Sequence, residues 1–335
     1  MQVLKTLPAK SVASAITSPP YWWIRDYGNG EWKGGRRDCA HRPIRSNGRI
    51  SVYGDSCPDC GATRLSYPLG MEPTIDQFVG NLCDIFDEVG RVLRDDGALW
   101  VNIGDTFSSR EKGSDGLKFP EGCLLNIPAR FANEMLERGW VLRNDIIWQK
   151  PSVRPDGVKN RFVMDYEHFY FFTKADSTHT HYFDQVEVPG KTVDWAKERS
   201  IWVENSGVNA CGHDSAYSEG LIERPLLACS RPDGIVLDPF LGTGTTGLVA
   251  AHYGRDFIGI ELDQDYFNRT VARFANRGFS VQLRVPTQHA PLNTVPKRQR
   301  PGRRPVAAAA LKSFPRPVAT TTSHQTTPQL VEGRC

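Results

Sequence analysis

The sequence predicts one doubly wound α/β domain, in which helices cover both faces of a parallel sheet. Short apolar segments that suit buried strands alternate with amphipathic helices along most of the 335 residues. In the second half, a glycine loop joins an apolar strand to a helix, and another strand follows that helix, as in the βαβ units of such sheets. The hydrophobic fraction of 39% is ordinary for a soluble globular protein with a substantial core.

Each expected element rests on its apolar pattern and on the residues that end it. The clearest helix begins after Thr74, and its apolar residues recur at helical spacing as far as the Asp95-Asp96-Gly97 turn. The short apolar run after this turn is typical of a strand. The expected strands are 12–16, 98–103, 140–148, 166–173, 235–238 and 257–261, and the expected helices are 75–93, 128–138, 219–229, 245–253 and 264–276.

Two stretches fall outside this pattern. Residues 28–70 are polar and glycine-rich, which indicates an insertion with little core of its own. Between Arg284 and Arg316 there are eight basic residues and no acidic one, a composition that favours a polyanionic partner or a solvated arm. We therefore expect a single domain over residues 1–283, followed by a disordered basic tail over residues 284–335.

The composition also limits the cellular location that we expect. No apolar run reaches the roughly 18 residues that a membrane span needs, and the first residues lack the apolar segment of a signal peptide. The eight cysteines show no regular disulfide-like spacing, which in a chain of this length indicates a reducing compartment. The expected location is the cytoplasm, with no membrane partner.

The stretch Thr17-Ser18-Pro19-Pro20-Tyr21-Trp22 forms a stiff loop directly after the first expected strand. Its two prolines restrict the backbone and remove two amide donors, so the carbonyls of Ser18 and Pro19 have no competing amide beside them. The loop offers a hydroxyl, free carbonyls and aromatic faces, which suit a planar ligand that carries an amino group. A proline-aromatic turn that only closes the strand is the alternative.

A second motif is the loop that runs from Asp238 to Gly244, between an expected strand and an expected helix. Glycines let a backbone approach a ligand closely, and a helix N-terminus presents unpaired amides. Glu261 follows Gly242 by 19 positions, at the end of the next strand, where an acid can accept hydrogen bonds from ribose hydroxyls. No third glycine supports a dinucleotide, and Asp238 favours a cationic group over a phosphate. The motif therefore predicts S-adenosylmethionine, with NAD or a purely structural βαβ unit as alternatives.

Together, the two motifs resemble the β group of amino-methylating DNA methyltransferases, in which the Ser-Pro-Pro-Tyr block precedes the cofactor block. The resemblance spans residues 3–274 and is most similar to the zinc-insert DNA methylases of bacteriophages and bacteria. It implies a Rossmann-like S-adenosylmethionine-dependent methyltransferase fold, circularly permuted, with a small zinc-binding insert. Other matching stretches are Arg25-Asp26-Tyr27-Gly28, Leu69-Gly70-Met71-Glu72-Pro73-Thr74, Arg91-Val92-Leu93-Arg94-Asp95-Asp96-Gly97, Asn102-Ile103-Gly104-Asp105 and Ile146-Ile147-Trp148.

The resemblance implies roles for individual residues. Ser18 and the carbonyl of Pro19 accept the two N–H bonds of the target amino group, and Tyr21 stacks on the flipped base. Glu261 holds the ribose, and Asp238 lies near the methionine end of the cofactor. The remaining implied residues are Pro20 in the catalytic block, Pro239, Phe240, Gly242, Gly244, Thr245, Thr246 and His213 around the cofactor, and Trp22, Lys150, Arg154, Lys159 and Arg161 against DNA.

The basic loop after Trp148 has two interpretations. Its lysines and arginines would mostly grip phosphates, which gives affinity rather than sequence choice, and a merely solvated loop is the alternative. Residues 150–210 as a whole are the candidate target-recognition region. The insertion with its cysteines is a second candidate. Neither segment contains a recognisable reading helix, so the sequence leaves the target site open.

The insertion carries a potential metal site. Cys39-x-His41 and Cys57-x-x-Cys60-Gly61 place two ligand pairs on either side of a loop, as a tetrahedral structural zinc requires. A segment without its own core gains folding free energy from the metal. Free thiols in a loop are the alternative.

The sequence therefore predicts a site-specific DNA methyltransferase that acts on double-stranded DNA. Cytosine N4 is the favoured target, because a serine in the catalytic block is more usual among cytosine-N4 enzymes, and adenine N6 is the alternative. A zinc-dependent DNA-binding regulator without catalysis is a rival from another class. A cognate restriction enzyme is a candidate partner, and the protein is expected to be a monomer or a homodimer.

Overall fold

The structure is a computed structural model, and it describes the chain in several stretches. The description covers residues 1–26, 31–41, 45–46, 51–52, 56–109, 112, 115–153, 157–175, 181–184, 198–207, 217–284 and 329–333. The predicted tail therefore lies largely outside the described residues, and the predicted target-recognition region is described except for residues 154–156, 176–180, 185–197 and 208–210.

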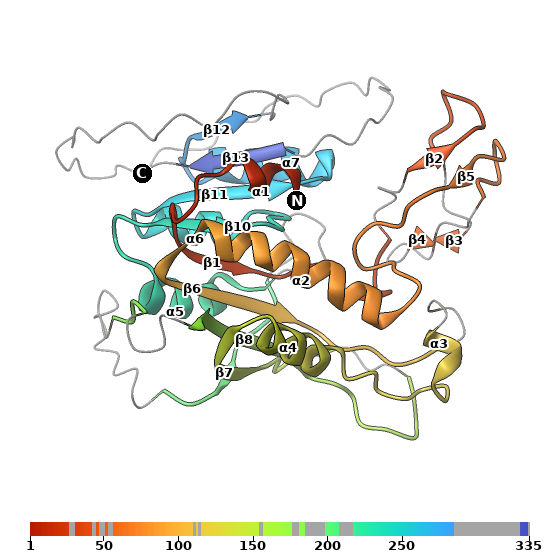
Figure 1. Ribbon diagram of the computed structural model, residues 1–335, viewed down its shortest axis with the longest axis horizontal. Helices are drawn as coiled ribbons and strands as arrows, with labels where there is room; N and C mark the ends of the chain where they lie inside the picture. Colours follow the sequence, from red (N-terminus) through yellow and green to blue (C-terminus); the bar gives the residue numbers. More distant parts are fainter. Residues whose placement is uncertain are drawn as a thin grey trace.

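A nine-stranded sheet forms the centre of the described part of the chain, in the order β12-β13-β11-β10-β1-β6-β8-β7-β9 (Figure 1). The four central strands, from β11 to β6, are parallel, as the sequence predicts. These strands are β1 (Val12–Thr17), β6 (Leu93–Ile103), β10 (Ile235–Asp238) and β11 (Asp256–Glu261).

Beyond β6, the prediction of a parallel sheet is wrong for β8, whereas β7 and β9 run in the same direction as the central strands. Strand β8 runs antiparallel to both β6 and β7, because the connection between β7 and β8 forms a hairpin rather than a helical crossover. The apolar patterns of β7 and β8 were sufficient to locate these two strands but carry no information on direction, and β9 was not predicted. The strands on this side are β7 (Trp140–Gln149), β8 (Tyr166–Lys174) and β9 (Ile201–Val203).

Helices cover both faces of the sheet, and each face has its own hydrophobic core (Figure 1). Alternate strand residues supply the two cores, so Leu99 and Val101 of β6 pack on one side while Trp100 packs on the other. The first core lies under α1 (Gln2–Thr6), α2 (Ile75–Val92) and α4 (Ile127–Glu137), and the second under α5 (Glu219–Cys229), α6 (Thr245–His252) and α7 (Gln264–Asn276).

The cap residues explain why the helix boundaries follow the sequence closely. The Thr74 hydroxyl accepts the Gln77 amide at the start of α2, and the Asp263 carboxylate accepts the Asp265 and Tyr266 amides at the start of α7. A further short helix, α3 (Asp115–Lys118), precedes α4. None of the helices in the described stretches is long and apolar enough to cross a membrane.

At the other end of the sheet, the structure differs from the predicted disordered tail. Strand β13 (Gln329–Gly333) lies between β11 and β12 (Val281–Arg284) and is antiparallel to both. A segment within the predicted disordered region, 284–335, is therefore part of the sheet. It pairs with strands about 50–70 residues earlier in the chain, and its pattern was hidden in a proline- and threonine-rich context.

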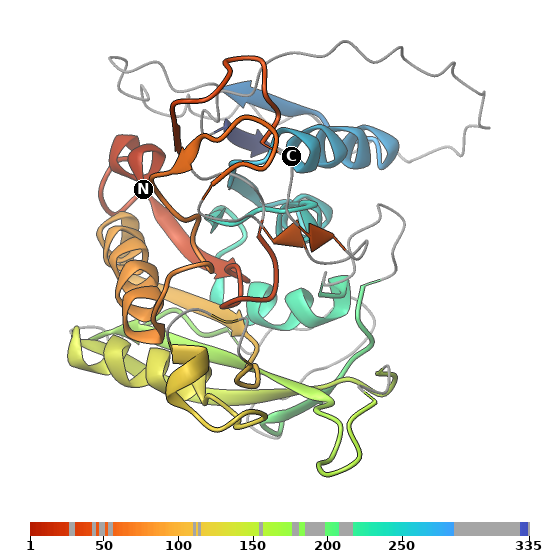
Figure 2. The same ribbon diagram turned by 90° about the vertical axis from the view of Figure 1, so that its right-hand side faces the viewer.

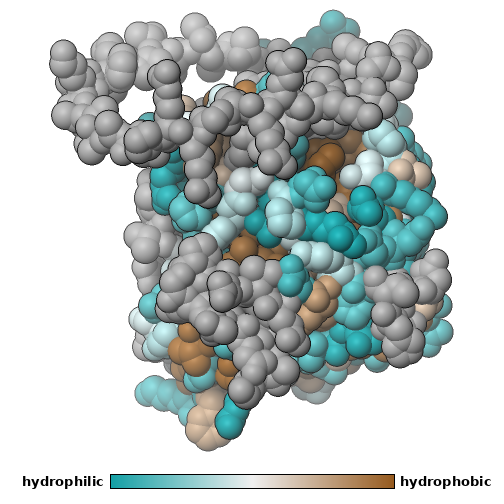
Figure 3. Space-filling view, turned by 90° about the vertical axis from the view of Figure 1, so that its left-hand side faces the viewer, coloured by the Kyte–Doolittle hydropathy of each residue, from teal (hydrophilic) through white to brown (hydrophobic). Residues whose placement is uncertain are grey.

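The insertion stands apart from the sheet, at the carboxyl ends of the central parallel strands (Figures 1 and 2). It contains two short antiparallel pairs, β2 (Trp32–Lys33) with β5 (Thr63–Arg64) and β3 (Arg45–Ser46) with β4 (Ser51–Val52). An ion pair of Arg64 with Asp26 ties it to the loop after β1, and both side chains are fully buried. On the side of the molecule away from the insertion, the described surface is a mixture of hydrophilic and smaller hydrophobic areas (Figure 3).

Candidate active site

Two neighbouring strands bring the predicted catalytic and cofactor motifs together. Strands β1 and β10 are parallel and pair directly, with Ala15 opposite Leu237. Their carboxyl ends therefore meet, although the two motifs are more than 200 residues apart in the chain. A hydrogen bond of 2.6 Å from the Thr17 hydroxyl to the Asp238 carboxylate joins the last residues of the two strands.

A cavity of about 240 Å³ opens at these strand ends. One part of its wall is apolar and includes Val3, Leu4 and Phe240, which suit a flat ring system. Another part is polar and includes Ser18 and Glu261. The predicted residues that line the cavity are Ser18, Pro19, Pro20, Tyr21, Pro239, Phe240, Gly242, Thr245 and Glu261.

Three of the predicted cofactor residues lie behind the cavity wall and do not line the cavity. Asp238 is 1% exposed, and its carboxylate accepts hydrogen bonds from Thr17, the Phe240 amide and Tyr217. Burial raises the pKa of Asp238. Gly244 and Thr246 likewise lie behind the wall rather than in it. The Asp238 carboxylate therefore supports the loop, and His213 lies outside the described residues.

Glu261 occupies the position that the sequence predicts for a ribose ligand. One carboxylate oxygen accepts the Gly242 amide at 2.7 Å, and the other accepts the amides of Leu262 and Asp263 at 2.8 Å each. Burial raises the pKa of Glu261 to about 7, against the opposing effect of these amides. The residue thus links the glycine loop to the end of β11 and presents a titratable acid to the cavity.

Tyr21 lies in a polar cluster that the sequence predicts only in part. Its hydroxyl lies 2.6 Å from Glu167 Oε2 and 3.0 Å from Asn102 Oδ1, and Ser18 Oγ lies 3.4 Å from it. Asn102 belongs to a stretch that matches the family resemblance. Glu167 was missed, because it is one residue within an aromatic strand and no local pattern distinguishes it. Burial, and next the charge of Glu167, raise the pKa of Tyr21 well above its ordinary range, so the phenol stays protonated.

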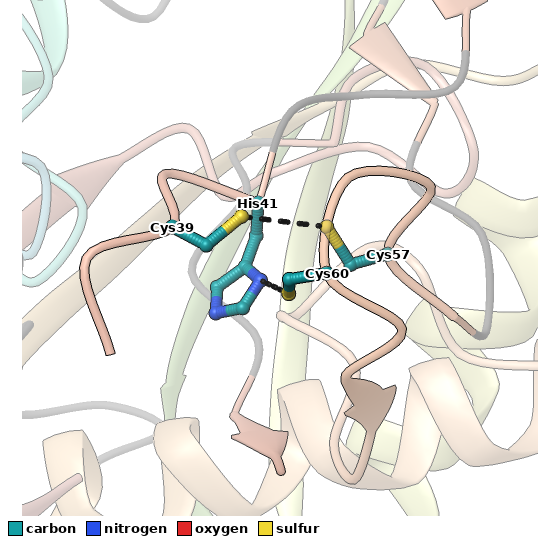
Figure 4. A group of neighbouring side chains, drawn as sticks. All are labelled: Cys39, His41, Cys57 and Cys60. Carbon is teal, nitrogen blue, oxygen red and sulfur yellow. Dashed lines mark hydrogen bonds between the residues drawn. The ribbon is translucent and has the colours of Figure 1, made fainter. Parts of the chain in front are cut away.

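The predicted metal ligands converge within the insertion. Cys39, His41, Cys57 and Cys60 point toward one another (Figure 4), and their ligand atoms all lie within 4.8 Å of one another. The sulfur atoms of Cys39 and Cys57 are 3.7 Å apart, and Cys60 Sγ lies 3.5 Å from His41 Nδ1. Two thiolates on a tetrahedral zinc would be about 3.8 Å apart, given Zn–S bonds near 2.3 Å. The donor set and its spacing therefore fit zinc.

The predicted DNA-contacting residues differ in their surroundings. The structure contradicts the prediction for Trp22, which is 1% exposed and donates its indole N–H to the Glu72 carbonyl at 3.0 Å. The Lys150 ammonium forms an ion pair with Glu167, and the Arg161 guanidinium stacks on Phe107.

The remaining two positions of the basic loop are less constrained. Lys159 is exposed, and Arg154 lies outside the described residues. The exposed lysine is the described member of the set that best fits the predicted phosphate contact.

The fold and the cavity define a class of enzyme. In this α/β sheet, a glycine loop faces a stiff serine-proline-proline-tyrosine loop across one cavity. This arrangement suits the transfer of a group from a nucleoside cofactor to an amino nitrogen. A family model described as DNA methylase, for N6 and N4 methyltransferases, matches residues 12–272. The chain therefore belongs to this DNA methylase family.

Individual relatives agree with this assignment. The type II methyltransferase M.Cfr9I of Citrobacter freundii is 32% identical over 302 residues, which cover 84% of this chain and 87% of the relative. The solved PvuII DNA methyltransferase (cytosine-N4-specific) shares the fold with a TM-score of 0.56 at 18% identity, over 81% of this chain and 82% of that one. A Thermus thermophilus protein, described as a putative DNA modification methylase and solved with S-adenosyl-L-methionine, gives a TM-score of 0.54 at 23% identity, over 82% and 90% of the two chains.

Proposed function

We propose that this methyltransferase transfers a methyl group from S-adenosylmethionine to N4 of a cytosine that is flipped out of duplex DNA. The observation that carries the proposal is the placement of Ser18, Tyr21, Gly242 and Glu261 around one cavity at the ends of β1, β10 and β11. The solved Thermus relative, with its bound cofactor, supports the choice of S-adenosylmethionine.

The residues of the cavity suit the two halves of the reaction. S-adenosylmethionine supplies a methyl group that is already activated on a sulfonium, so the protein mainly has to position it. Glu261 is available to the ribose hydroxyls, and the apolar wall at Phe240 to the adenine. The charge of a buried carboxylate, Asp238, lies just behind the loop, where it favours a cationic group.

On the DNA side, the proposal has Ser18 and the Pro19 carbonyl, which both belong to residues that line the cavity, accept the two N–H groups of the target amine. Acceptors outside the plane of the base localise the nitrogen lone pair and so make the amine a better nucleophile. The Tyr21 ring can stack on the base, which must leave the helix because the cavity cannot reach an amine within the stack. A serine suffices here because the methylated nitrogen is cationic and loses its proton readily.

The choice of base is tested by product analysis. Plasmid DNA is incubated with the protein and S-adenosylmethionine, digested to nucleosides and analysed by mass spectrometry. We expect N4-methylcytosine, with Tyr21→Ala reducing the yield at least a hundredfold. N6-methyladenine as the product would replace cytosine by adenine in the proposal, and the absence of both products would refute it.

We further propose that Cys39, His41, Cys57 and Cys60 hold one structural zinc, which stabilises the insertion near the DNA-binding side. The fit of the ligand spacing to tetrahedral zinc supports this assignment. Elemental analysis of the purified protein is expected to give one zinc per chain, and substoichiometric zinc after purification without chelators would count against it.

The type II relatives suggest a biological setting. We propose that the protein protects specific DNA sites as the methylating half of a restriction-modification pair. Sequencing of DNA from cells that express the protein, with detection of modified bases, would give the site. Resistance of that site to a restriction enzyme encoded nearby is the expected result, and scattered methylation without a common sequence would contradict it.

A further inference from the structure

Glu167 occupies a position at the active site that none of the predicted motifs explains. It lies near the start of β8, and its side chain is only 14% exposed. One carboxylate oxygen forms an ion pair with Lys150, and the other lies 2.6 Å from the Tyr21 hydroxyl. A carboxylate can only accept hydrogen bonds, so the short contact is donated by Tyr21.

This contact determines how the Tyr21 hydroxyl can be used. The phenol has one hydrogen and two acceptors within reach, Glu167 at 2.6 Å and Asn102 Oδ1 at 3.0 Å. The charged and nearer acceptor takes the hydrogen, because hydrogen bonds to ionised groups are shorter and stronger. The lone pairs of the phenol oxygen then face Ser18 Oγ, which is 3.4 Å away.

The direction of the hydrogen bonds at Tyr21 also sets the orientation of the Ser18 hydroxyl. Since the Tyr21 oxygen can accept from Ser18, the Ser18 hydrogen is directed toward Tyr21 and the Ser18 lone pairs remain free. A serine hydroxyl has one hydrogen and can act either as donor or as acceptor toward an incoming amine. Only the acceptor orientation suits an amino group, which presents two N–H donors.

We propose that Glu167 is a positioning residue that sets the direction of the Ser18–Tyr21–Glu167 hydrogen bonds and thereby holds Ser18 as an acceptor for the target amino group. This inference rests on the proposed function of Ser18. Lys150 supports the arrangement by pairing with the second carboxylate oxygen, which holds the Glu167 side chain in place. In this structure the Lys150 ammonium is thus engaged by Glu167.

Glu167→Gln tests the direction of the bonds with almost no change in shape. The new amide can donate to the Tyr21 oxygen, which reverses the bonds and turns Ser18 toward the donor orientation. Loss of one charge-assisted hydrogen bond corresponds to roughly a 10- to 100-fold lower rate. We expect this loss in the single-turnover rate constant of methyl transfer at saturating DNA and S-adenosylmethionine, with the dissociation constant of S-adenosylmethionine within about twofold of that of the wild type.

A double variant separates this role from a merely structural one. Tyr21→Phe keeps the ring and removes the hydroxyl, so Glu167→Gln in the Tyr21→Phe background should cause no further loss of rate. Multiplicative losses in the double variant would overturn the proposal, and so would a Glu167→Gln rate equal to that of the wild type. Asp165→Asn is the matched control, because it removes a nearby carboxylate whose contact is with Gln149, and its rate should stay within about twofold.

A second measurement does not depend on activity. In protein labelled with ¹³Cζ-tyrosine, the Tyr21 resonance is assigned by its absence in Tyr21→Phe. Glu167→Gln should shift this resonance, because the phenol loses a charged acceptor, while Asp165→Asn should leave it in place. An unmoved resonance would overturn the proposal even in a protein without methyltransferase activity. A shifted resonance combined with no transfer to any base would instead refute the proposed function alone.

Discussion

Gly104→Ala is expected to disable the enzyme by displacing Tyr21. Gly104 follows β6, and a Cβ at this position would lie 2.6 Å from Cε2 and 3.0 Å from Cδ2 of the Tyr21 ring. Carbon atoms pack best at about 3.5–4.0 Å, so the ring must move by roughly 1 Å. That movement breaks the 2.6 Å contact with Glu167 or tilts the ring that we propose to stack on the base. A misplacement of this size costs about 100-fold in rate.

Single-turnover methylation and thermal unfolding distinguish this effect from a loss of fold. We expect about a 100-fold lower rate but a destabilisation of only about 1–3 kcal/mol, as for other overpacked sites. Gly80→Ala is the matched control: a Cβ there has no heavy atom within 4 Å, and the residue lies within α2, where alanine is favoured by up to about 1 kcal/mol. A Gly104→Ala rate within threefold of the wild type would refute the reasoning that the ring position matters.

Three further predictions concern the cofactor, the metal and the buried ion pair. Ribose hydroxyls favour the ionised form of Glu261, whose pKa is about 7. Calorimetry should therefore show that the affinity for S-adenosylmethionine falls by up to about tenfold per pH unit below pH 7 and is constant above it. Glu261→Gln should remove this pH dependence. Removal of zinc, or Cys57→Ser, should lower the melting temperature and the methylation rate, whereas Cys123→Ser should change neither. Asp26→Ala removes the carboxylate that pairs with the buried Arg64 guanidinium. We expect the free energy of unfolding in urea to fall by about 3–5 kcal/mol. A decrease of less than about 1 kcal/mol would contradict the burial of this ion pair.

The sequence was most informative where short-range chemistry decides the structure. Thr74 marks the beginning of α2, because a side-chain oxygen that accepts a helix amide acts within three residues. The strands β1 and β10 were located within a residue of their ends, because both are buried on two faces and read as continuous apolar runs. The cysteine spacing likewise predicted the convergence of Cys39, His41, Cys57 and Cys60.

Features that depend on distant partners were not predictable in the same way. The antiparallel direction of β8 follows from its pairing with β6 and β7, and the place of β13 follows from its pairing with β11 and β12. Trp22 follows the catalytic tyrosine and was expected to face DNA, but Glu72 offers its indole a buried acceptor. Glu167 acquires its significance only because the hairpin places it against Tyr21. In each case the deciding neighbour is far away in the sequence.

A short segment of chain connects the insertion to the candidate active site. Asp26 pairs with Arg64 of the insertion, while the preceding Arg25 lines the cavity and donates to the Tyr266 hydroxyl at 3.0 Å. This segment lies only a few residues after Tyr21, so the insertion anchors the end of the catalytic loop that the prolines do not stiffen. A metal in the insertion therefore has a physical route to the active site: it fixes the strand that carries Arg64, which in turn fixes Asp26 and the loop. We expect the stability of the insertion and the rate of methyl transfer to fall together for this reason.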